Sequence, residues 1–534
     1  MSEFPAMLSL AHAHPAQTIA QLVTHVPEAY QPVSAIRDAD HDISYQQLFS
    51  EVSPIAQALL ANGVQKGDRV AVWAPNSVHW VLIALAIHLC GGILVPLNTR
   101  MKGHEAQYIL RNSGCRLLFS VGTFLQQDYP AALAEEGVLD ELMCVLFPEA
   151  HSQVIASVDW DVFLASGTSM TPENVLARAS SVCASDFSDL LFTSGTTGQP
   201  KGVLCTHGGT IKAFRTYAQT LALGVSERYL IVNPFFHAFG YKAGWVTALL
   251  AGCTILPEAV FDAKRVMQRV AVEQVNILPG PPTLYTSIMA DPSFGKIDLS
   301  SLRVAVTGSA SVSPSLIEQM RNIMRIENVL TAYGLTECGG LATMCAPDDS
   351  AEIVARTSGK AIAGTELRIF VDGQFTDAAG RVGEICLRGY HIMHGYWQNE
   401  AATEATIDDQ GWLHTGDLGQ LDAQGNLLIT GRLKDMYICG GFNCYPAEIE
   451  AMMQRHPDIQ EVAVVGIPDA RMGEVGCAFI LPRGAAKIDT EVLIAWCREH
   501  MANYKVPRQI RVVESLPMNA SNKVLKHELQ KMCE

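Results

Sequence analysis

Short apolar runs alternate along this chain with segments in which apolar residues recur every three or four positions. The run at 304–307 has the pattern of a buried strand. Ser313 and Pro314 are typical of a helix N-cap and first turn, and 317–324 has the spacing of an amphipathic helix. A second strand pattern begins at Val329. Because this alternation continues through much of the first 430 residues, it predicts an α/β fold with mostly parallel sheets.

The pattern changes in the last quarter of the chain, first to that of a hairpin with its turn at 422–426. The segment that follows has a strand pattern of its own at 462–465 and a helix pattern at 492–501. A chain of 534 residues is also too long for one ordinary core. We therefore expect two domains, 1–433 and 434–534.

The longest apolar run, 81–97, raises the question of a membrane span. It contains His88 and is interrupted by Gly91 and Gly92, and it is too short to cross a bilayer comfortably. We expect a buried helix followed by a buried strand, and no integral membrane segment.

Composition narrows the function classes. With 38 basic and 54 acidic residues the net charge is -16, which argues against a nucleic-acid-binding surface. The 14 cysteines form no CxxC pair, so neither a zinc cluster nor a disulfide framework is expected. The first ten residues lack the pattern of a signal peptide, and the cysteines are therefore interpreted as reduced thiols of a cytoplasmic protein.

Residues 190–203 combine a strand-like apolar run with four hydroxyl groups, three glycines and a lysine. Hydroxyl and bare N–H groups donate to phosphate oxygens, glycines let the backbone approach closely, and Lys201 adds a positive charge. The order differs from a Walker A loop, because Lys201 precedes Gly202 and no Ser or Thr follows at the required place. A flexible surface loop is the alternative, but the lysine and the preceding strand favour phosphate binding. The expected contacts are Thr193, Ser194, Gly195, Thr196, Thr197, Gly198 and Lys201.

Further polar groups suit a nucleotide, although each has a structural explanation in isolation. Glu337 offers the hard oxygen ligand that Mg²⁺ prefers, but alone it would be a solvated turn residue. Asp417, expected in a loop before the hairpin, and Arg432 would more often form a surface ion pair. The strand-to-helix turn 308–310 is explained equally well by structure and by nucleotide contact. Lys523, near the C-terminus, would alone be a solvated charge.

Taken together and in this order, the motifs resemble the signatures of the adenylate-forming superfamily, which includes acyl-CoA ligases, luciferases and peptide-synthetase adenylation domains. The resemblance covers nearly the whole chain. It implies a large N-terminal domain of mixed, mostly parallel sheets with helices, and a small mobile α+β C-terminal domain that rotates about a hinge at Lys434. It also implies ATP, Mg²⁺ and coenzyme A as ligands: a carboxylate attacks the α-phosphate, and the thiol then displaces AMP.

The resemblance assigns roles to the candidate residues. Glu337 would hold Mg²⁺, and Lys523 would neutralise charge as the carboxylate approaches the α-phosphate. Asp417 would accept the ribose hydroxyls, and His237 would form a gate between the acyl pocket and the thiol tunnel. Most relatives have Gly before the lysine, where this chain has Asn522, the least costly substitute if that position needs a positive φ. The other nucleotide and coenzyme A contacts are expected from Gly308, Ser309, Ala310, Tyr333, Gly334, Thr336, Arg432, Lys434, Gly440 and Gly441.

Three runs, at 233–244, 278–283 and 436–443, resemble bacterial ligases of steroid catabolism. Those enzymes act on the propanoate side chain of the indanedione that remains after steroid rings A and B are removed. The residues expected to contact such an acid are His237, Tyr241, Lys242, Trp245, Gly339 and Gly340.

Each acyl-site assignment has a structural alternative. Lys242, with Tyr241, would meet a ring ketone; a solvated lysine is an equally good explanation. Gly339 and Gly340 would leave space for the bicycle, or would relieve backbone crowding. For His237 the alternative to a gate is a satisfied core histidine.

Other functions stay open at this point. The acid could be a medium-chain fatty acid or an aryl acid, the acceptor could be a carrier protein, and Asn522 is the one hint of a nucleotide-binding protein without catalysis. The expected partners are a small-molecule carboxylic acid, ATP and coenzyme A, and no nucleic acid. The oligomeric state is left open, with a homodimer among the options.

Overall fold

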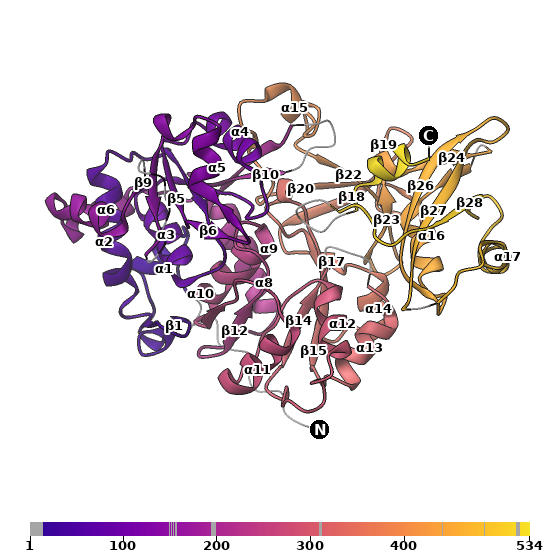
Figure 1. Cartoon of the computed structure of the whole chain (residues 1–534), viewed down its shortest axis with the longest axis horizontal. Coiled ribbons are helices and arrows are strands. Elements are labelled where there is room, and N and C mark those ends of the chain that lie inside the picture. The colour runs from indigo at the N-terminus through magenta and orange to yellow at the C-terminus, as the bar shows by residue number, and fades with distance from the viewer. Residues whose placement is uncertain are drawn as a thin grey trace. The chain divides into compact units, whose positions relative to one another are not determined.

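The computed structural model of the chain describes residues 14–148, 150, 152, 154, 157–193, 199–308, 312–440, 442–484, 486–518 and 524–533. These residues divide into two compact units (Figure 1). The first unit is formed by residues up to 355, by 359–366 and by 387–413, and the second by 356–358, 367–386 and 414 onwards. The domain boundary expected at 433 and 434 lies inside the second unit and stays a prediction.

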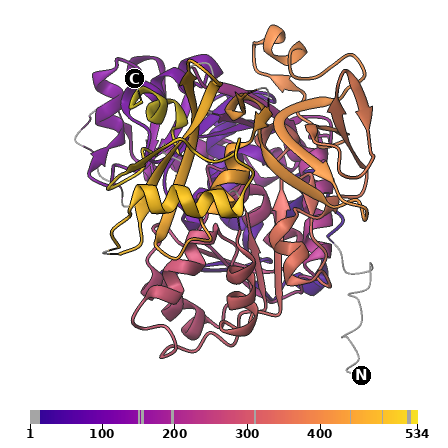
Figure 2. The same ribbon diagram turned by 90° about the vertical axis from the view of Figure 1, so that its right-hand side faces the viewer.

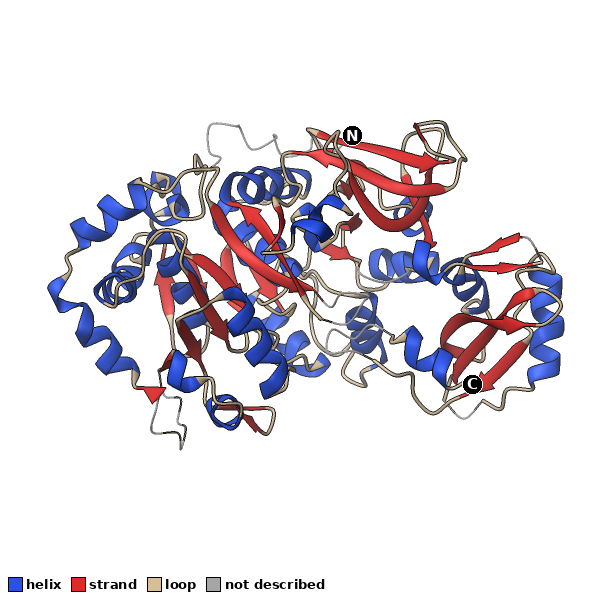
Figure 3. Ribbon diagram, turned by 90° about the horizontal axis from the view of Figure 1, so that it is seen from above, coloured by secondary structure: helices blue, strands red, loops and turns tan. Residues whose placement is uncertain are grey.

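The first unit contains an eight-stranded sheet flanked by helices (Figure 3). Its strand order is β21-β11-β10-β4-β3-β5-β8-β9, and every neighbouring pair from β10 to β9 is parallel. The strands are β3 (Arg69–Trp73), β4 (Ile93–Pro96), β5 (Leu117–Ser120), β8 (Met143–Leu146), β9 (Ser157–Val158), β10 (Phe187–Thr193), β11 (Lys201–Thr206) and β21 (Gly395–Tyr396). The predicted parallel α/β architecture is confirmed, with an antiparallel hairpin of β10 and β11 near one edge.

The sheet is buried on both faces. In β3, Val70 and Val72 pack into one apolar cluster, whereas Ala71 and Trp73 pack into another. Successive side chains of a strand point to opposite faces, so the two clusters lie on the two sides of the sheet.

Helices α3 (Val78–Leu89) and α4 (Gly103–Ser113) contribute to the two clusters, respectively. The expectation for 81–97 is confirmed, because α3 is followed directly by the buried strand β4. Within the described residues, no helix is both long and apolar enough to cross a membrane.

The first unit also contains two four-stranded sheets and the two-stranded sheet of β6 (Thr123–Phe124) and β7 (Gln127–Asp128). One four-stranded sheet has the order β12-β13-β1-β2 and the other β14-β15-β16-β17. Their strands are β12 (Arg228–Ile231), β13 (Thr254–Pro257), β1 (Ser34–Arg37), β2 (Asp42–Ser44), β14 (Val304–Thr307), β15 (Asn328–Tyr333), β16 (Thr343–Met344) and β17 (Lys360–Ala361).

The strand–helix–strand unit predicted around residue 313 is confirmed as β14, α13 (Pro314–Asn322) and β15. The Ser313 hydroxyl accepts a hydrogen bond from the Leu316 N–H at 3.2 Å, as an N-cap does. Helix α13 ends two residues before the predicted limit, and Arg325 then has a left-handed φ of 60°.

A five-stranded sheet, β19-β18-β20-β22-β23, carries the predicted hairpin. The Asp422 carboxylate accepts the N–H of Asn426 at 2.8 Å and so closes the expected turn. The strands are β19 (Gln374–Thr376), β18 (Thr365–Val371), β20 (Gly383–Gly389), β22 (Leu413–Leu421) and β23 (Leu427–Arg432).

The C-terminal sheet of the second unit has the order β25-β24-β27-β26, with β28 pairing β27. Its strands are β24 (Tyr437–Cys439), β25 (Phe442–Cys444), β26 (Ile459–Asp469), β27 (Gly473–Pro482) and β28 (Gln509–Val512), and its helices α16 (Pro446–Met453), α17 (Thr490–His500) and α18 (Lys526–Lys531). Figure 2 shows α17 across one face of this sheet. The strand expected at 462–465 lies in β26, and the helix expected at 492–501 is α17, capped by Asp489.

The remaining elements connect these layers. They are α1 (Gln21–Thr24), α2 (Leu48–Ala61), α5 (Tyr129–Glu135), α6 (Trp160–Ser166), α7 (Pro172–Ser180), α8 (His207–Thr220), α9 (Ala238–Gly240), α10 (Thr247–Ala251), α11 (Ala263–Glu273), α12 (Pro282–Ala290), α14 (Ala351–Arg356) and α15 (Glu400–Glu404). All 14 cysteines are free: Cys183 is exposed, Cys533 is half-buried, and the others are buried.

One strand of the large sheet carries a charge into the apolar core. Asp189 of β10 and Lys242 both have fully buried side chains, and they form an ion pair of 2.9 Å. The Ser188 hydroxyl donates to the second carboxylate oxygen at 2.6 Å. Burial would lower the pKa of Lys242, but the Asp189 carboxylate outweighs it and holds that pKa above its ordinary value.

We expect Lys242→Met to lower the free energy of unfolding by about 3–5 kcal/mol, because it leaves the Asp189 charge buried without its partner. The double variant Asp189→Asn/Lys242→Met removes both charges and should recover much of that loss. Urea unfolding measures both. If the double variant is no more stable than Lys242→Met, the ion pair is not what stabilises this part of the core.

Candidate active site

The ends of the predicted phosphate loop are fixed by the β10–β11 hairpin. Thr193, the last residue of β10, pairs with Lys201, the first residue of β11. The Thr193 hydroxyl donates to the Lys201 carbonyl at 3.5 Å. The loop residues Ser194, Gly195, Thr196, Thr197 and Gly198 lie outside the described residues.

A tyrosine that the sequence did not single out joins two of the predicted residues. The Tyr396 hydroxyl donates to Glu337 Oε1 at 3.0 Å, and Lys201 Nζ lies 4.9 Å from the centre of the Tyr396 ring. No spacing signal connects residue 396 with 201 or 337, because the contact depends on β21 pairing with β11. Lys201 and Glu337 thus contact the same side chain, that of Tyr396.

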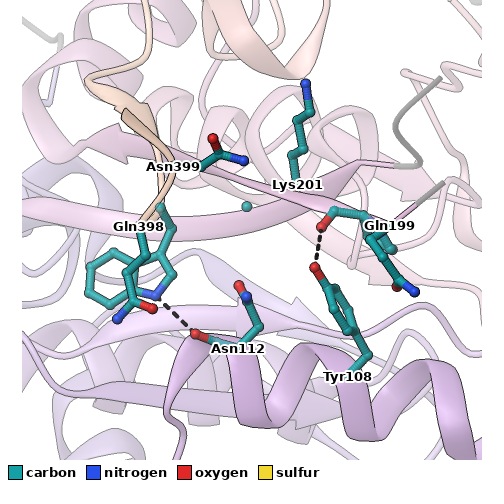
Figure 4. A pocket seen from close by; sticks show the side chains of 9 residues that line it. Tyr108, Asn112, Gln199, Lys201, Gln398 and Asn399 are labelled. Atoms are coloured by element: carbon teal, nitrogen blue, oxygen red, sulfur yellow. Dashed lines mark hydrogen bonds between the residues drawn. The ribbon is translucent and has the colours of Figure 1, made fainter. Parts of the chain in front are cut away.

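A pocket of about 250 Å³ adjoins the same hairpin (Figure 4). The Tyr108 hydroxyl donates to the Pro200 carbonyl at 3.3 Å, and the Trp397 indole N–H donates to the Asn112 carbonyl at 3.1 Å. Figure 4 shows Lys201 pointing away from Tyr108 and Asn112, so neutral hydroxyl and amide groups border the pocket on that side. The bond from Tyr108 braces the segment where the chain leaves the predicted phosphate loop. The lining residues are Tyr108, Asn112, Gln199, Pro200, Lys201, Gly202, Trp397, Gln398 and Asn399.

The 333–337 motif begins with the last residue of β15 and continues as a tightly packed turn. Tyr333 is buried, and a Cβ at Gly334 would lie 2.4 Å from the Gly340 carbonyl oxygen. Thr336 and Glu337 lie in one short 3₁₀ turn, and the Glu337 carbonyl accepts the Met393 N–H at 2.8 Å. The motif is therefore held by backbone contacts and leaves the Glu337 carboxylate half-exposed.

In the predicted strand-to-helix turn 308–310, Gly308 is the one residue that the structure describes, and it directly follows β14. Its added Cβ would come within 3.2 Å of the Ala332 carbonyl oxygen. Ser309 and Ala310 lie outside the described residues.

Asp417 and Arg432 lie directly opposite each other on β22 and β23. The expectation that Asp417 stands in a loop before the hairpin is wrong, because β22 begins at Leu413 and includes it. Arg432 Nε contacts Asp417 Oδ1 at 3.0 Å, with the carboxylate largely buried and the guanidinium about half-exposed. The two predicted residues are brought together as an ion pair.

The part of β22 just before Asp417 is fastened to β20 by a carboxylate that the sequence did not single out. Glu384 Oε1 accepts the Gly416 N–H at 2.9 Å, and Thr415 donates to the Ile385 carbonyl at 2.7 Å. Gly416 has a left-handed φ of 69°, which favours glycine at this point of the strand. Glu384 therefore fixes the backbone from which Asp417 projects.

Glu384, Cys386 and His414 also form a cluster of metal-ligand types within the described residues. Glu384 Oε2 lies 2.8 Å from His414 Nδ1, a hydrogen-bond distance. Two ligands of one tetrahedral zinc ion would stand about 3.3 Å apart. We therefore interpret the cluster as a hydrogen-bonded network that orients Glu384.

Three side chains of the predicted acyl-site segment are buried in the core. The side chains of Tyr241, Lys242 and Trp245 are fully buried, and the Tyr241 hydroxyl lies 3.1 Å from His88 Nε2. The alternative of a solvated Lys242 is wrong, because its ammonium group is the partner of Asp189.

For His237 and the two glycines, the structure bears on which of the alternatives holds. His237 is exposed, so the core-histidine alternative is wrong; its Nδ1 accepts the Phe239 N–H at 3.3 Å and caps α9. A Cβ at Gly339 would lie 2.9 Å from the His391 carbonyl oxygen, and one at Gly340 would lie 2.9 Å from Ala238 Cβ. This geometry favours the explanation that the glycines relieve crowding.

The coenzyme A and hinge residues belong to the second unit. Lys434 is exposed in a short turn after β23. Gly440 has a φ of 59° and donates its N–H to the Met472 carbonyl at 2.8 Å. Gly441 and Lys523 lie outside the described residues.

Comparisons with known proteins agree with this arrangement. The AMP-binding enzyme family matches residues 23–397, and the AMP-binding enzyme C-terminal domain matches 448–523. The ATP-bound MatB structure from Rhodopseudomonas palustris is 26% identical, with a TM-score of 0.85 over 96% of this chain and 98% of that one. The resemblance to the adenylate-forming superfamily and the predicted fold are confirmed.

Two curated relatives carry one description, "3-[(3aS,4S,7aS)-7a-methyl-1,5-dioxo-octahydro-1H-inden-4-yl]propanoyl:CoA ligase". The protein from Mycobacterium tuberculosis (strain ATCC 25618 / H37Rv) is 45% identical over 96% of this chain and 97% of its own. The protein from Rhodococcus jostii (strain RHA1) is 44% identical over 93% and 95%.

We expect Glu384→Ala to raise KM for ATP about tenfold while kcat at saturating ATP is largely kept. Loss of the hydrogen bond to Gly416 would loosen the strand segment just before Asp417, and about 1.4 kcal/mol corresponds to a factor of ten. Steady-state kinetics with varied ATP measures this. Glu366→Ala, at the more exposed Glu366–Arg388 ion pair, is the control and should keep the wild-type KM. Equal KM values for both variants would contradict the role of Glu384.

Proposed function

We propose that this chain, which belongs to the AMP-binding enzyme family and is an AMP-forming acid–CoA ligase, acts on the propanoate side chain of a steroid-derived bicyclic diketone. The observation that carries the proposal is the 45% and 44% identity, across nearly the full chain, to two ligases named for that acyl group. The three runs at 233–244, 278–283 and 436–443 add support.

The reaction proceeds in two half-reactions. The substrate carboxylate attacks the α-phosphate of ATP, the bond to the β-phosphate breaks, and acyl-AMP and pyrophosphate form. The thiol of coenzyme A then attacks the acyl carbon, AMP leaves with its phosphate oxygen, and a thioester remains.

The N-terminal part of the chain holds the phosphates. Lys201 and the hydroxyls of Thr193, Ser194, Thr196 and Thr197 donate to them, supported by the hairpin that fixes both ends of the loop. Glu337 holds Mg²⁺: a half-exposed carboxylate is the hard oxygen donor that this ion prefers. When bound, the ion neutralises charge on the phosphate that departs.

The other groups act on ribose, on the reacting centre and on the thiol. Asp417 accepts the ribose hydroxyls, with Arg432 beside it at 3.0 Å. Lys523 neutralises charge at the α-phosphate. Gly440 and Gly441 leave room for the pantetheine arm, and Lys434 is the hinge about which the C-terminal domain, 434–534, rotates between the half-reactions.

We expect Lys523→Ala to reduce acyl-AMP formation by roughly 10²–10³-fold, because the developing charge at the α-phosphate loses its cation. Thioester formation from supplied acyl-AMP should stay largely intact. Single-turnover assays of each half-reaction separate the two effects. Lys531→Ala, an exposed lysine paired with Glu528, is the control. Equal loss in both half-reactions would rule out this role for Lys523.

The acyl specificity is tested with a panel that contains the bicyclic propanoate, a medium-chain fatty acid and an aryl acid. We expect kcat/KM for the bicyclic acid to exceed the others by about tenfold or more, the discrimination that about 1.4 kcal/mol of pocket contacts supplies. Comparable values across the panel would refute the steroid-derived substrate while leaving the ligase activity intact.

A further inference from the structure

Tyr396 is held in place by its backbone. It lies in β21, where Val203 of β11 is its pairing partner, and its N–H donates to the Thr403 hydroxyl at 2.9 Å. The next residue, Trp397, donates its N–H to the Gly202 carbonyl at 2.7 Å. The phenol ring therefore projects from a fixed strand and keeps its place when neighbouring side chains move.

The two ends of this rigid side chain face opposite charges. Its hydroxyl donates to Glu337 Oε1 at 3.0 Å, and its ring faces Lys201 Nζ, 4.9 Å from the ring centre. In the described part of the chain no ion pair joins Lys201 to Glu337.

We propose that Tyr396 is a positioning residue that separates Lys201 from Glu337, so that the ammonium group stays available to phosphate and the carboxylate to the metal ion. A direct ion pair between the two would neutralise both groups and remove them from the nucleotide. The aromatic face holds the lysine by cation–π attraction, and the hydroxyl holds the carboxylate by a hydrogen bond to a charged acceptor. This inference rests on the proposed roles of Lys201 and Glu337.

Two substitutions separate the two contacts. Tyr396→Phe keeps the ring and removes the hydrogen bond, so Glu337 is free to turn towards Lys201. Tyr396→Leu removes both contacts. We expect Tyr396→Phe to weaken metal binding about tenfold, the change that loss of a charge-assisted hydrogen bond produces, with little change in KM for the acid. Tyr396→Leu should in addition raise KM for ATP at saturating metal.

The direct readout is binding of Mn²⁺, as a paramagnetic substitute for Mg²⁺, to the full chain saturated with a non-hydrolysable ATP analogue, followed by electron paramagnetic resonance. The Mg²⁺ concentration that gives half-maximal pyrophosphate release is the kinetic readout. Tyr390→Phe is the matched control: the ring of Tyr390 lies 3.9 Å from Lys212 Nζ, and neither residue is part of the proposed site.

A double variant tests whether Tyr396 keeps Lys201 apart from Glu337 or only supports the Glu337 carboxylate. In Lys201→Met no ammonium group is left to capture Glu337, so adding Tyr396→Phe should weaken Mn²⁺ binding clearly less than it does in the wild type. An equal loss in both backgrounds would overturn the separating role. Wild-type Mn²⁺ binding in Tyr396→Phe would overturn the inference as a whole. Failure of the wild type to release pyrophosphate with any acid would instead refute the proposed function.

Discussion

The buried ion pair of Asp189 and Lys242 is the constraint on which the first unit depends. Two full charges in an apolar core are stable only when each faces the other at hydrogen-bond distance, here 2.9 Å. Asp189 belongs to the strand that runs into the phosphate loop, and Lys242 belongs to the segment that follows His237. The pair therefore fixes the strand that leads into the predicted phosphate loop relative to the segment predicted to meet the acid.

Much of the fold could be predicted because local signals determine it. The Ser313 cap, the Asp422 turn and the apolar alternation of β14 and β15 each arise from neighbouring residues, and they appear in the structure nearly where expected. Helix α13 ends two residues before the predicted limit. The left-handed backbone after it falls on Arg325, and without a glycine at that position the sequence carries no signal for it. The family and the ligase activity followed from the order of the motifs and are confirmed by the comparisons.

The site contacts that sequence reasoning missed depend on strands far apart in the chain. Tyr396 reaches Lys201 only because β21 pairs with β11, and Glu384 reaches Gly416 only because β20 lies beside β22. The two explanations offered for Lys242 were a substrate contact and a solvated side chain. Neither included the ion pair with Asp189 that the structure shows. The sequence shows which side chains are charged, but the order of strands in the sheets determines which groups they contact.

The distribution of the cysteines has a practical consequence for testing the proposed hinge. Burial raises the pKa of thiols such as Cys90 to about 12, which suppresses the thiolate that electrophiles attack. Cys183 in the first unit is exposed and Cys533 in the second is half-buried. The chain thus has one cysteine in each unit that is not fully buried, and a maleimide dye pair attached to the two would test by energy transfer whether the proposed domain rotation occurs.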